Sequence, residues 1–279
     1  MSFPEIIKLA LQEDIGSGDY STLASVPENA QGKMKLLVKE NGIIAGMEVA
    51  REVLWQVDPS ISMKCFKNEG DEVKVGDIVF ELVGPARSML TAERTLLNFM
   101  QRISGIATVS KQYADAVKGT KTKILDTRKT TPNFRAFEKY AVKIGGSENH
   151  RFGLYDMIML KDNHIDFAGG IEKAIDRTHE YLTQKGLNLK IEIETRTLDE
   201  VKRVVKHGKI DRIMLDNFTP KQITEALKMI TGKYETEASG GITLQNITEY
   251  AQTGVDYISI GALTHHIKSL DLSLKFVAI

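Results

Sequence analysis

Cationic side chains gather in the middle of the chain, around two short apolar runs. The run Ile124–Leu125 leads into the motif DTRK, and Met157–Leu160 leads into KDNH. The candidate ligand-binding cations of this stretch are Arg128, Lys129, His150, Arg151 and Lys161. Singly, each is most often a solvated loop charge, but together they would repel one another without an anion. Arg offers a planar fork of donors and Lys a compact charge, which favours a small ligand with several negative oxygens.

Two acids end later apolar runs. Glu194 closes KIEIE and Asp216 closes RIMLD. Carboxylates from two strand ends could hold a hydrated Mg²⁺ together with substrate oxygens. Glu192 shares the face of Glu194 in a strand and is the weaker candidate. Alternatively, these acids only neutralise the cations.

Glycines mark a third group, in EASGGI and SIGALTHH. Its candidate phosphate ligands are Ser239, Gly240, Gly241, Gly261 and His265. Glycine lets backbone N–H groups approach a phosphate at a helix start, and barrels often bind phosphate at their final βα loops. His265 and His266 could equally be surface residues.

The strands that position these groups repeat from Lys123 onward. The apolar runs KILD, MIML, KIEIE, RIML, YETEA and YISI alternate with helical segments. This alternation predicts right-handed βα units and an α/β fold, an open or incomplete parallel barrel of six or seven strands. Its active site would lie at the C-terminal strand ends. Pro132 is expected in the first turn of a helix that ends near Ile144.

The N-terminal part reads differently. It is expected to begin with a helix over residues 3–12, then a hairpin over 33–46 turning at Asn41–Gly42, a helix to about Val57 and short strands over 61–85. A helix over 89–103 follows. We therefore predict an N-terminal α+β sandwich-like domain (1–108), a barrel domain (109–264) and a C-terminal helix (265–279) packing back on the first.

Composition narrows the partners. Among 279 residues, 37 Lys and Arg balance 37 Asp and Glu, which argues against a nucleic-acid or anionic-membrane partner. The single cysteine, Cys65, excludes an internal disulfide and favours the cytoplasm. Neither a membrane-spanning segment nor a signal peptide is expected.

The motifs DTRKT, GGSENHRFGLYD and LKDNH resemble the type II phosphoribosyltransferases, and most of all the quinolinate phosphoribosyltransferase family. The resemblance runs from Asp14 to His266. Ser147 stands where many relatives have a third glycine. The resemblance implies that phosphoribose is transferred from phosphoribosyl pyrophosphate (PRPP) to quinolinate with decarboxylation. The products would be nicotinate mononucleotide, pyrophosphate and CO2, in NAD biosynthesis.

The same resemblance implies roles for residues. The quinolinate ligands would be Arg128, Lys129, His150, Arg151, Lys161 and, from the partner subunit, Arg94. PRPP would bind as its Mg²⁺ complex to Glu194, Asp216 and the glycine group, and the catalytic residues would be Lys129, Lys161, Glu194 and Asp216. A homodimer with shared sites is implied, and further assembly into hexamers stays open. From the residues alone, Arg94 could simply pair with Glu93.

Three alternatives remain open at this point. Lys161 could form a Schiff base in an aldolase-type lyase. The barrel could bind an anionic metabolite without catalysis, although that would leave Glu194 and Asp216 without a use. The chain could also be the molybdenum-linked relative of the same fold family.

Overall fold

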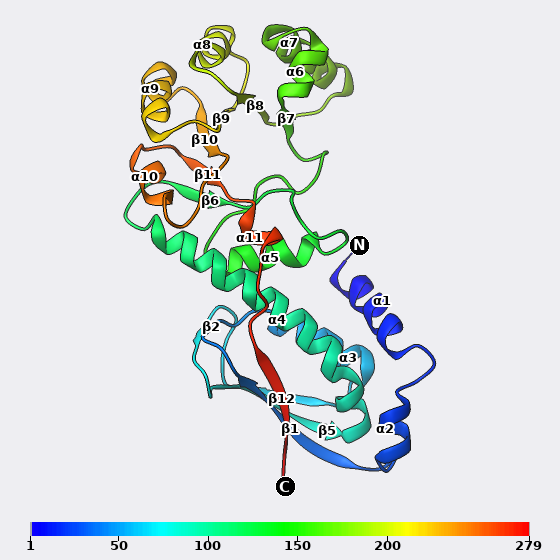
Figure 1. Ribbon diagram of the computed structural model, residues 1–279. Helices are drawn as coiled ribbons and strands as arrows, with labels where there is room; N and C mark the ends of the chain where they lie inside the picture. Colours follow the sequence, from blue (N-terminus) through cyan, green and yellow to red (C-terminus); the bar gives the residue numbers. More distant parts are fainter. Residues whose placement is uncertain (1, 279) are drawn as a thin grey trace. The chain divides into compact units, whose positions relative to one another are not determined.

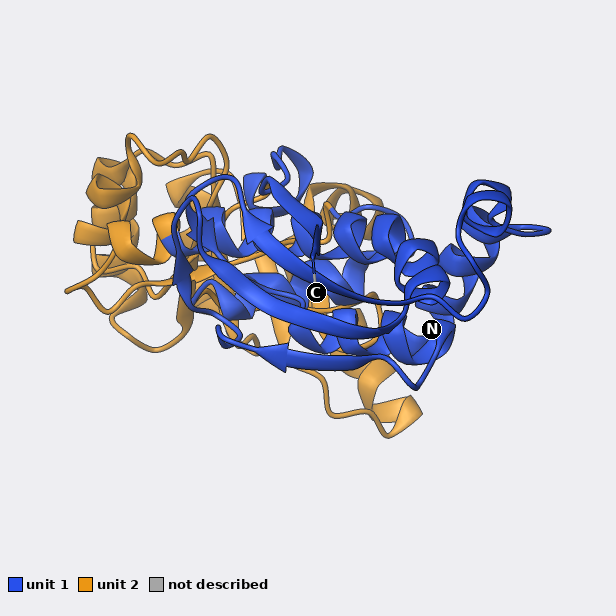
Figure 2. Ribbon diagram, turned by 90° about the horizontal axis from the view of Figure 1, so that it is seen from below, with its two compact units in different colours: residues 1–111, 130–146, 262–279 blue, residues 112–129, 147–261 orange. Residues whose placement is uncertain are grey.

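The computed structural model describes residues 2–278, and these form two compact units. Unit 1 comprises residues up to 111, 130–146 and from 262 onward, and unit 2 comprises 112–129 and 147–261 (Figure 2). The chain therefore crosses between the units several times. The segment 130–146, expected within the barrel domain, groups with unit 1.

Unit 1 combines helices with a small antiparallel sheet (Figure 1). Its helices are α1 (Phe3–Ile15), α2 (Tyr20–Ser25), α3 (Met47–Val57), most of α4 (Ala86–Ala116), α5 (Arg135–Ile144) and α11 (Ala262–His265). Its strands are β1 (Gln31–Val38), β2 (Gly42–Ile43), β3 (Ser62–Cys65), β4 (Glu72–Val73), β5 (Ile78–Pro85) and β12 (Leu272–Val277). The main sheet has the order β12-β1-β5-β3, and alternate residues of β1 are buried, as the alternating sequence predicts.

The predicted hairpin at Asn41–Gly42 is wrong. Strand β1 pairs with β5 and β12, whereas β2 pairs with β4. Gly42 serves close packing instead, because a Cβ atom there would lie 2.6 Å from side-chain atoms of both Leu270 and Thr108.

The predicted C-terminal helix is also wrong, because residues 272–277 form strand β12, which pairs antiparallel with β1. Leu272 and Leu274 are buried while their neighbours Ser273 and Lys275 are half-buried or exposed. This period of two fits a strand with one face on the core.

The helix predicted to start near Pro132 begins later, with α5 at Arg135. Asn133 has a φ of 60°, a left-handed conformation that an α-helix cannot include. Glu138 secures the turn before the helix, since its carboxylate accepts the N–H of Thr131 at 3.0 Å.

Unit 2 confirms the predicted parallel α/β fold. Its strands are β6 (Lys123–Leu125), β7 (Ile158–Leu160), β8 (Ile191–Thr195), β9 (Arg212–Asp216), β10 (Glu235–Ser239) and β11 (Tyr257–Ser259). Its helices are α6 (Asp162–Ala168), α7 (Ile171–Lys185), α8 (Leu198–His207), α9 (Pro220–Ile230), α10 (Ile247–Gln252) and the end of α4. The strand order is β6-β11-β10-β9-β8-β7, and among the described residues β6 and β7 do not pair, so the barrel is open.

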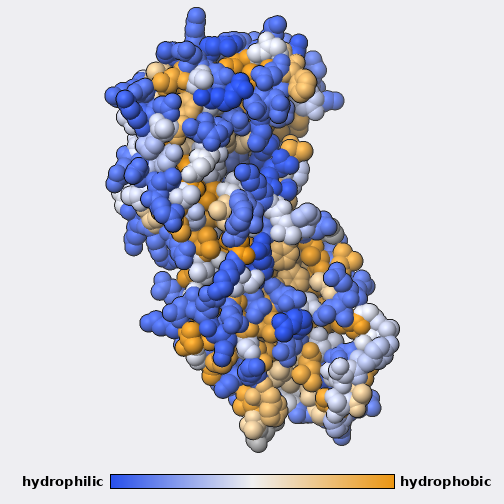
Figure 3. All heavy atoms as spheres, in the orientation of Figure 1, coloured by the Kyte–Doolittle hydropathy of each residue, from blue (hydrophilic) through white to orange (hydrophobic). Residues whose placement is uncertain are grey.

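Helices α7 to α9 are amphipathic. Each turns apolar residues such as Ile175, Val204 and Ile223 inward, where they are fully buried. Hydrophilic side chains predominate over these helices in Figure 3. Within residues 2–278, no helix combines the length and apolar character needed to cross a lipid bilayer.

The packing of β12 generates a test of unit 1. Leu274 is opposite Leu36 and is 3% exposed, so Leu274→Ala should lower the free energy of unfolding by about 2–4 kcal/mol. Lys275→Ala, at the next and exposed position, should change it by less than about 0.5 kcal/mol. Denaturant unfolding measures both, and equal effects would contradict the packing of β12 on the core.

Candidate active site

The carboxyl ends of the parallel strands bring the predicted acids and Lys161 to one edge of the unit 2 sheet. Asp216 ends β9 opposite Ser239 of β10, and Glu194 lies near the end of the adjacent strand β8. Lys161 directly follows β7 at the same edge. Residues from four strand ends therefore converge, because every parallel strand points the same way.

The two acids influence each other. Both are half-buried, and burial followed by the charge of Asp216 raises the pKa of Glu194. Burial also raises the pKa of Asp216, against the Asn217 hydrogen bond and the charge of Lys161. Two close, partly desolvated carboxylates repel, and a cation between them would relieve that repulsion. The pair thus fits a divalent metal with oxygen ligands.

Two of the predicted cations also lie close together. Burial and then the charge of Arg128 lower the pKa of Arg151. The guanidinium of Arg151 is fixed, since Nη1 donates to the carbonyl oxygen of Met157 at 3.0 Å. Arg128 and Lys129 are exposed at the end of β6, and the N–H of Lys129 donates to Thr127 Oγ1 at 3.0 Å.

His150 is buried and faces the barrel interior. Its Nε2 lies 3.1 Å from Glu192 Oε2 and 3.4 Å from Glu237 Oε2, and its Nδ1 accepts the Arg151 N–H at 2.7 Å. Burial lowers the pKa of His150, but hydrogen bonds to the two carboxylates and their charges outweigh it and raise the pKa. The role of His150 in binding the ligand stays a prediction.

A layer of buried charges lies beneath the strand-end acids. Glu192 and Glu237 are fully buried, and Arg212 Nη1 lies 3.1 Å from Glu237 and 3.9 Å from Glu192. Burial and then the charge of Glu237 raise the pKa of Glu192 to about 7. Glu237 and Arg212 were not among the predicted site residues. A usable signal was that Glu237 lies two residues before Ser239 and Arg212 four before Asp216, since such positions share one face of a strand.

His150, Glu192 and Glu237 are close enough to suggest a metal site, since one ligand atom from each lies within 4.8 Å of the others. Their chemistry argues against it. The Arg151 N–H donates to Nδ1, which therefore carries the lone pair, so the ring hydrogen lies on Nε2, beside the two carboxylates. In this state Nε2 has no lone pair for a metal, and Arg212 already supplies positive charge.

The predicted phosphate cradle has a constrained backbone. Gly240 and Gly241 have φ values of 92° and 65°, and a Cβ atom on Gly240 would lie 2.2 Å from Asn217 Oδ1. Asn217, which the sequence analysis passed over, donates its N–H to the Ser239 carbonyl at 2.8 Å. Contrary to expectation no helix starts at these glycines, because α10 begins only at Ile247.

Gly261, His265 and Arg94 complete the predicted set. Gly261 precedes the short helix α11, whose last residue, His265, is exposed and belongs to unit 1. Arg94 is exposed on α4, also in unit 1. Ser147 is buried in unit 2.

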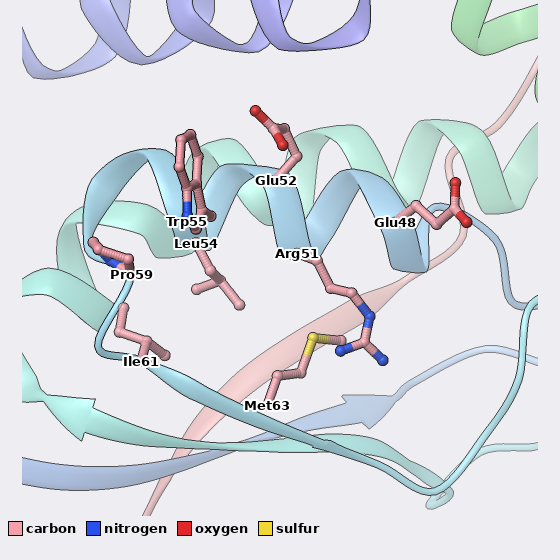
Figure 4. A pocket seen from close by; sticks show the side chains of 8 residues that line it. All are labelled: Glu48, Arg51, Glu52, Leu54, Trp55, Pro59, Ile61 and Met63. Carbon is pink, nitrogen blue, oxygen red and sulfur yellow. The ribbon is translucent and has the colours of Figure 1, made fainter.

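A separate hollow of about 530 Å³ lies in unit 1 (Figure 4). Helix α3 and the segment leading into β3 form it, with Trp55, Ile61 and Met63 among its lining residues. Its one cationic lining residue, Arg51, donates to Cys65 Sγ at 2.9 Å. The lining includes none of the residues that the sequence analysis selected.

Comparison with known proteins gives a consistent result. The profile described as "Quinolinate phosphoribosyl transferase, N-terminal domain" matches residues 19–104, and the corresponding C-terminal domain profile matches 106–275. The chain is 45% identical over 286 residues to quinolinate phosphoribosyltransferase (decarboxylating) 2b, mitochondrial, of Nicotiana tabacum. That match covers 97% of this chain and 81% of the tobacco protein.

Two further matches agree. The chain is 46% identical over 285 residues to nicotinate-nucleotide pyrophosphorylase (carboxylating), chloroplastic, of Arabidopsis thaliana, with 97% of this chain and 81% of that protein covered. The crystal structure of NadC from Streptococcus pyogenes superposes with a TM-score of 0.93 at 41% identity, covering 98% of this chain and 96% of that one. The resemblance carried by DTRKT, GGSENHRFGLYD and LKDNH is confirmed, and the chain belongs to the quinolinate phosphoribosyltransferase family.

Proposed function

We propose that this chain transfers the phosphoribosyl group of PRPP to quinolinate with loss of CO2, forming nicotinate mononucleotide and pyrophosphate for NAD biosynthesis. The observation that carries the proposal is that unit 2 contains both a pair of guanidinium groups, Arg128 and Arg151, and a pair of half-buried carboxylates at the strand ends, Glu194 and Asp216. The relatives named for this reaction share over 40% of its residues.

Quinolinate carries two neighbouring carboxylates, and the cations supply their counter-charge. Arg128 and Arg151 would hold them through charge-assisted hydrogen bonds, with Lys129, Lys161 and His150 adding charge and shape. Binding at these fixed groups would orient the pyridine nitrogen toward the sugar. Orientation alone removes a large part of the barrier to a two-substrate reaction.

Glu194 and Asp216 would hold Mg²⁺, which when bound neutralises charge on the pyrophosphate group of PRPP. The two acids also stabilise positive charge on the ribose carbon as the bond to pyrophosphate lengthens. Lys161, beside them, offers an ammonium group to the departing pyrophosphate. Backbone N–H groups of the Ser239–Gly241 loop, together with Gly261, would bind the 5′-phosphate. The role of His265 as a phosphate ligand stays a prediction.

Loss of CO2 follows from the first step. Nitrogen attack forms a pyridinium ring, whose positive charge accepts the electron pair left when the 2-carboxylate departs as CO2. A proton then takes the place of the carboxylate. The chain needs no covalent nucleophile for either step.

We further propose a homodimer in which Arg94 enters the partner's site, with assembly into hexamers as an open extension. The exposure of Arg94 on α4 supports this role.

The cytoplasm is the proposed location, since the single cysteine, Cys65, excludes an internal disulfide.

The Schiff-base alternative fits less well. Lys161 is exposed and lies near Glu194 and Asp216, whereas a lysine that forms imines is usually desolvated in apolar surroundings.

Incubation of the protein with quinolinate, PRPP and Mg²⁺ tests the proposed function directly. Nicotinate mononucleotide should form, and its formation would distinguish this chain from the molybdenum-linked relative. Absence of product at every pH and metal concentration tested would overturn the proposed function.

The acid pair provides one prediction. Glu194→Gln or Asp216→Asn should lower kcat/KM at least about 30-fold, because each removes a charged, partly desolvated group worth about 2 kcal/mol or more. The Mg²⁺ concentration needed for half-maximal rate should also rise. Glu172→Gln, which removes the same charge from an exposed pair with Arg203, serves as control and should leave the rate unchanged. Unchanged Mg²⁺ dependence in the first two variants would remove the metal assignment.

The guanidinium of Arg151 provides another. Arg151→Lys keeps the charge but loses the fork, so the KM for quinolinate should rise about tenfold or more. The control is Arg177→Lys, since Arg177 Nη1 also donates to a backbone carbonyl, that of Ala168, at 3.1 Å. Steady-state kinetics measures both. Nicotinate, which lacks the 2-carboxylate, should be a poor substrate, and equal turnover of both acids would refute a dicarboxylate site.

The shared site can be tested by mixing subunits. Arg94→Ala and Lys161→Ala homodimers should each be nearly inactive, because every site lacks one cation. Random exchange makes about half the dimers mixed, and each of these has one intact site, so activity should return to about a quarter of wild type. If refolded mixtures with demonstrated exchange stayed inactive, Arg94 would not act in the partner's site.

A further inference from the structure

His150 joins the two segments that carry the paired guanidinium groups. Its backbone N–H donates to Asp126 Oδ1 at 2.8 Å, and Asp126 is fully buried. Asp126 lies two residues before Arg128, and His150 directly precedes Arg151. Two backbone bonds also link these segments, from the Asp126 N–H to the Glu148 carbonyl at 3.1 Å and from the Glu148 N–H to the Ile124 carbonyl at 2.8 Å. The Asp126 carboxylate extends this link to His150, the residue next to Arg151.

The ring of His150 is held as firmly as its backbone. Glu192 and Glu237 contact Nε2 from inside the barrel, and the Arg151 N–H donates to Nδ1. Arg212 in turn fixes Glu237 through a 3.1 Å ion pair. The contacts leave little freedom for the backbone of Arg151, because both the residue before it and its own N–H are anchored.

The anchoring of His150 limits how far the guanidinium groups of Arg128 and Arg151 can separate. Burial and then the charge of Arg128 lower the pKa of Arg151, and two like charges on loosely held segments would move apart. The buried acids counteract that repulsion with opposite charge and with hydrogen bonds. Each such bond is expensive to lose, since its partner would remain buried without it.

We propose that Asp126 and Glu237 are positioning residues that act through His150 to fix the separation of Arg128 and Arg151, and so select a ligand with two adjacent carboxylates. The choice of quinolinate as that ligand rests on the proposed function. In this arrangement His150 orients Arg151 instead of supplying the main contact to the ligand. Both acids are fully buried, so in this arrangement neither contacts the substrate.

Asp126 offers a clean pair of variants. Asp126→Ala removes the acceptor of the His150 N–H, whereas Asp126→Asn keeps an oxygen at the same place. We expect Asp126→Ala to raise both the Kd and the KM for quinolinate about 10- to 100-fold, with the KM for PRPP unchanged. Its preference for quinolinate over nicotinate should fall by a similar factor. Asp126→Asn should restore the Kd to within about threefold of wild type.

The measurements are calorimetric binding of quinolinate to the whole protein and steady-state kinetics with each substrate varied. Asp256→Ala is the matched control, because Asp256 Oδ2 accepts the Thr236 N–H at 3.0 Å at the opposite end of the same sheet. It should lower stability without changing the Kd for quinolinate. If Asp126→Ala does not fold, Glu237→Gln keeps the side-chain volume, removes the charge and should raise the Kd about tenfold.

The outcomes separate the two ideas. A wild-type protein that binds quinolinate, together with Asp126→Ala or Glu237→Gln variants that bind it equally well, would overturn the positioning role alone. A fall in kcat with unchanged Kd and KM for quinolinate would also overturn it, since that pattern indicates a smaller folded fraction. A wild-type protein that binds no quinolinate would overturn the proposed function as well.

Discussion

Compensation of charge inside an open parallel barrel is the constraint on which the site depends. Side chains two residues apart on a strand share a face, so acids and cations form layers across β8, β9 and β10. Glu235 contacts Arg212 and Lys190 nearest the strand starts, and Glu192 and Glu237 contact His150 in the middle. Glu194 and Asp216 lie with Lys161 at the strand ends. Each layer is tolerated because its neighbours supply opposite charge in a medium that screens poorly.

This layering explains why cations can collect beside buried acids without destabilising the fold. A buried carboxylate alone costs several kcal/mol, roughly what its ion pairs and hydrogen bonds return. The Arg212 guanidinium serves several acids at once, since it lies within 4 Å of three carboxylates, those of Glu192, Glu235 and Glu237. It also lies over the Tyr257 ring, 4.0 Å from its centroid. The remaining repulsion between like charges lies at the carboxyl ends of the strands. There an anionic ligand would relieve the repulsion between the cations, and a divalent cation that between the acids.

Much of the fold was predictable because it depends on local pattern. The six strands of unit 2 are short apolar runs that end in polar residues, and helices of regular period separate them, so type and order follow from adjacent residues. The predictions of a hairpin over 33–46 and a helix over 265–279 were wrong for the same reason. An Asn-Gly pair or a short apolar run at the chain end permits several structures, and the packing of Leu270 on Gly42 and the pairing of β12 with β1 selected among them.

The sequence by itself determined which residues end the parallel strands, and therefore that Lys161, Glu194, Asp216 and Ser239 would meet, because parallel strands have their carboxyl ends at one edge. The sequence also identified the family, through the motifs around Arg128 and Arg151. Only the tertiary structure decided what lies beneath them. The contacts of His150 with Asp126, Glu192 and Glu237 join residues far apart in the chain. The Asn217 side chain has room only because Gly240, in the loop after β10, carries no Cβ atom. Such contacts follow from strand register and burial, which no single stretch of sequence specifies.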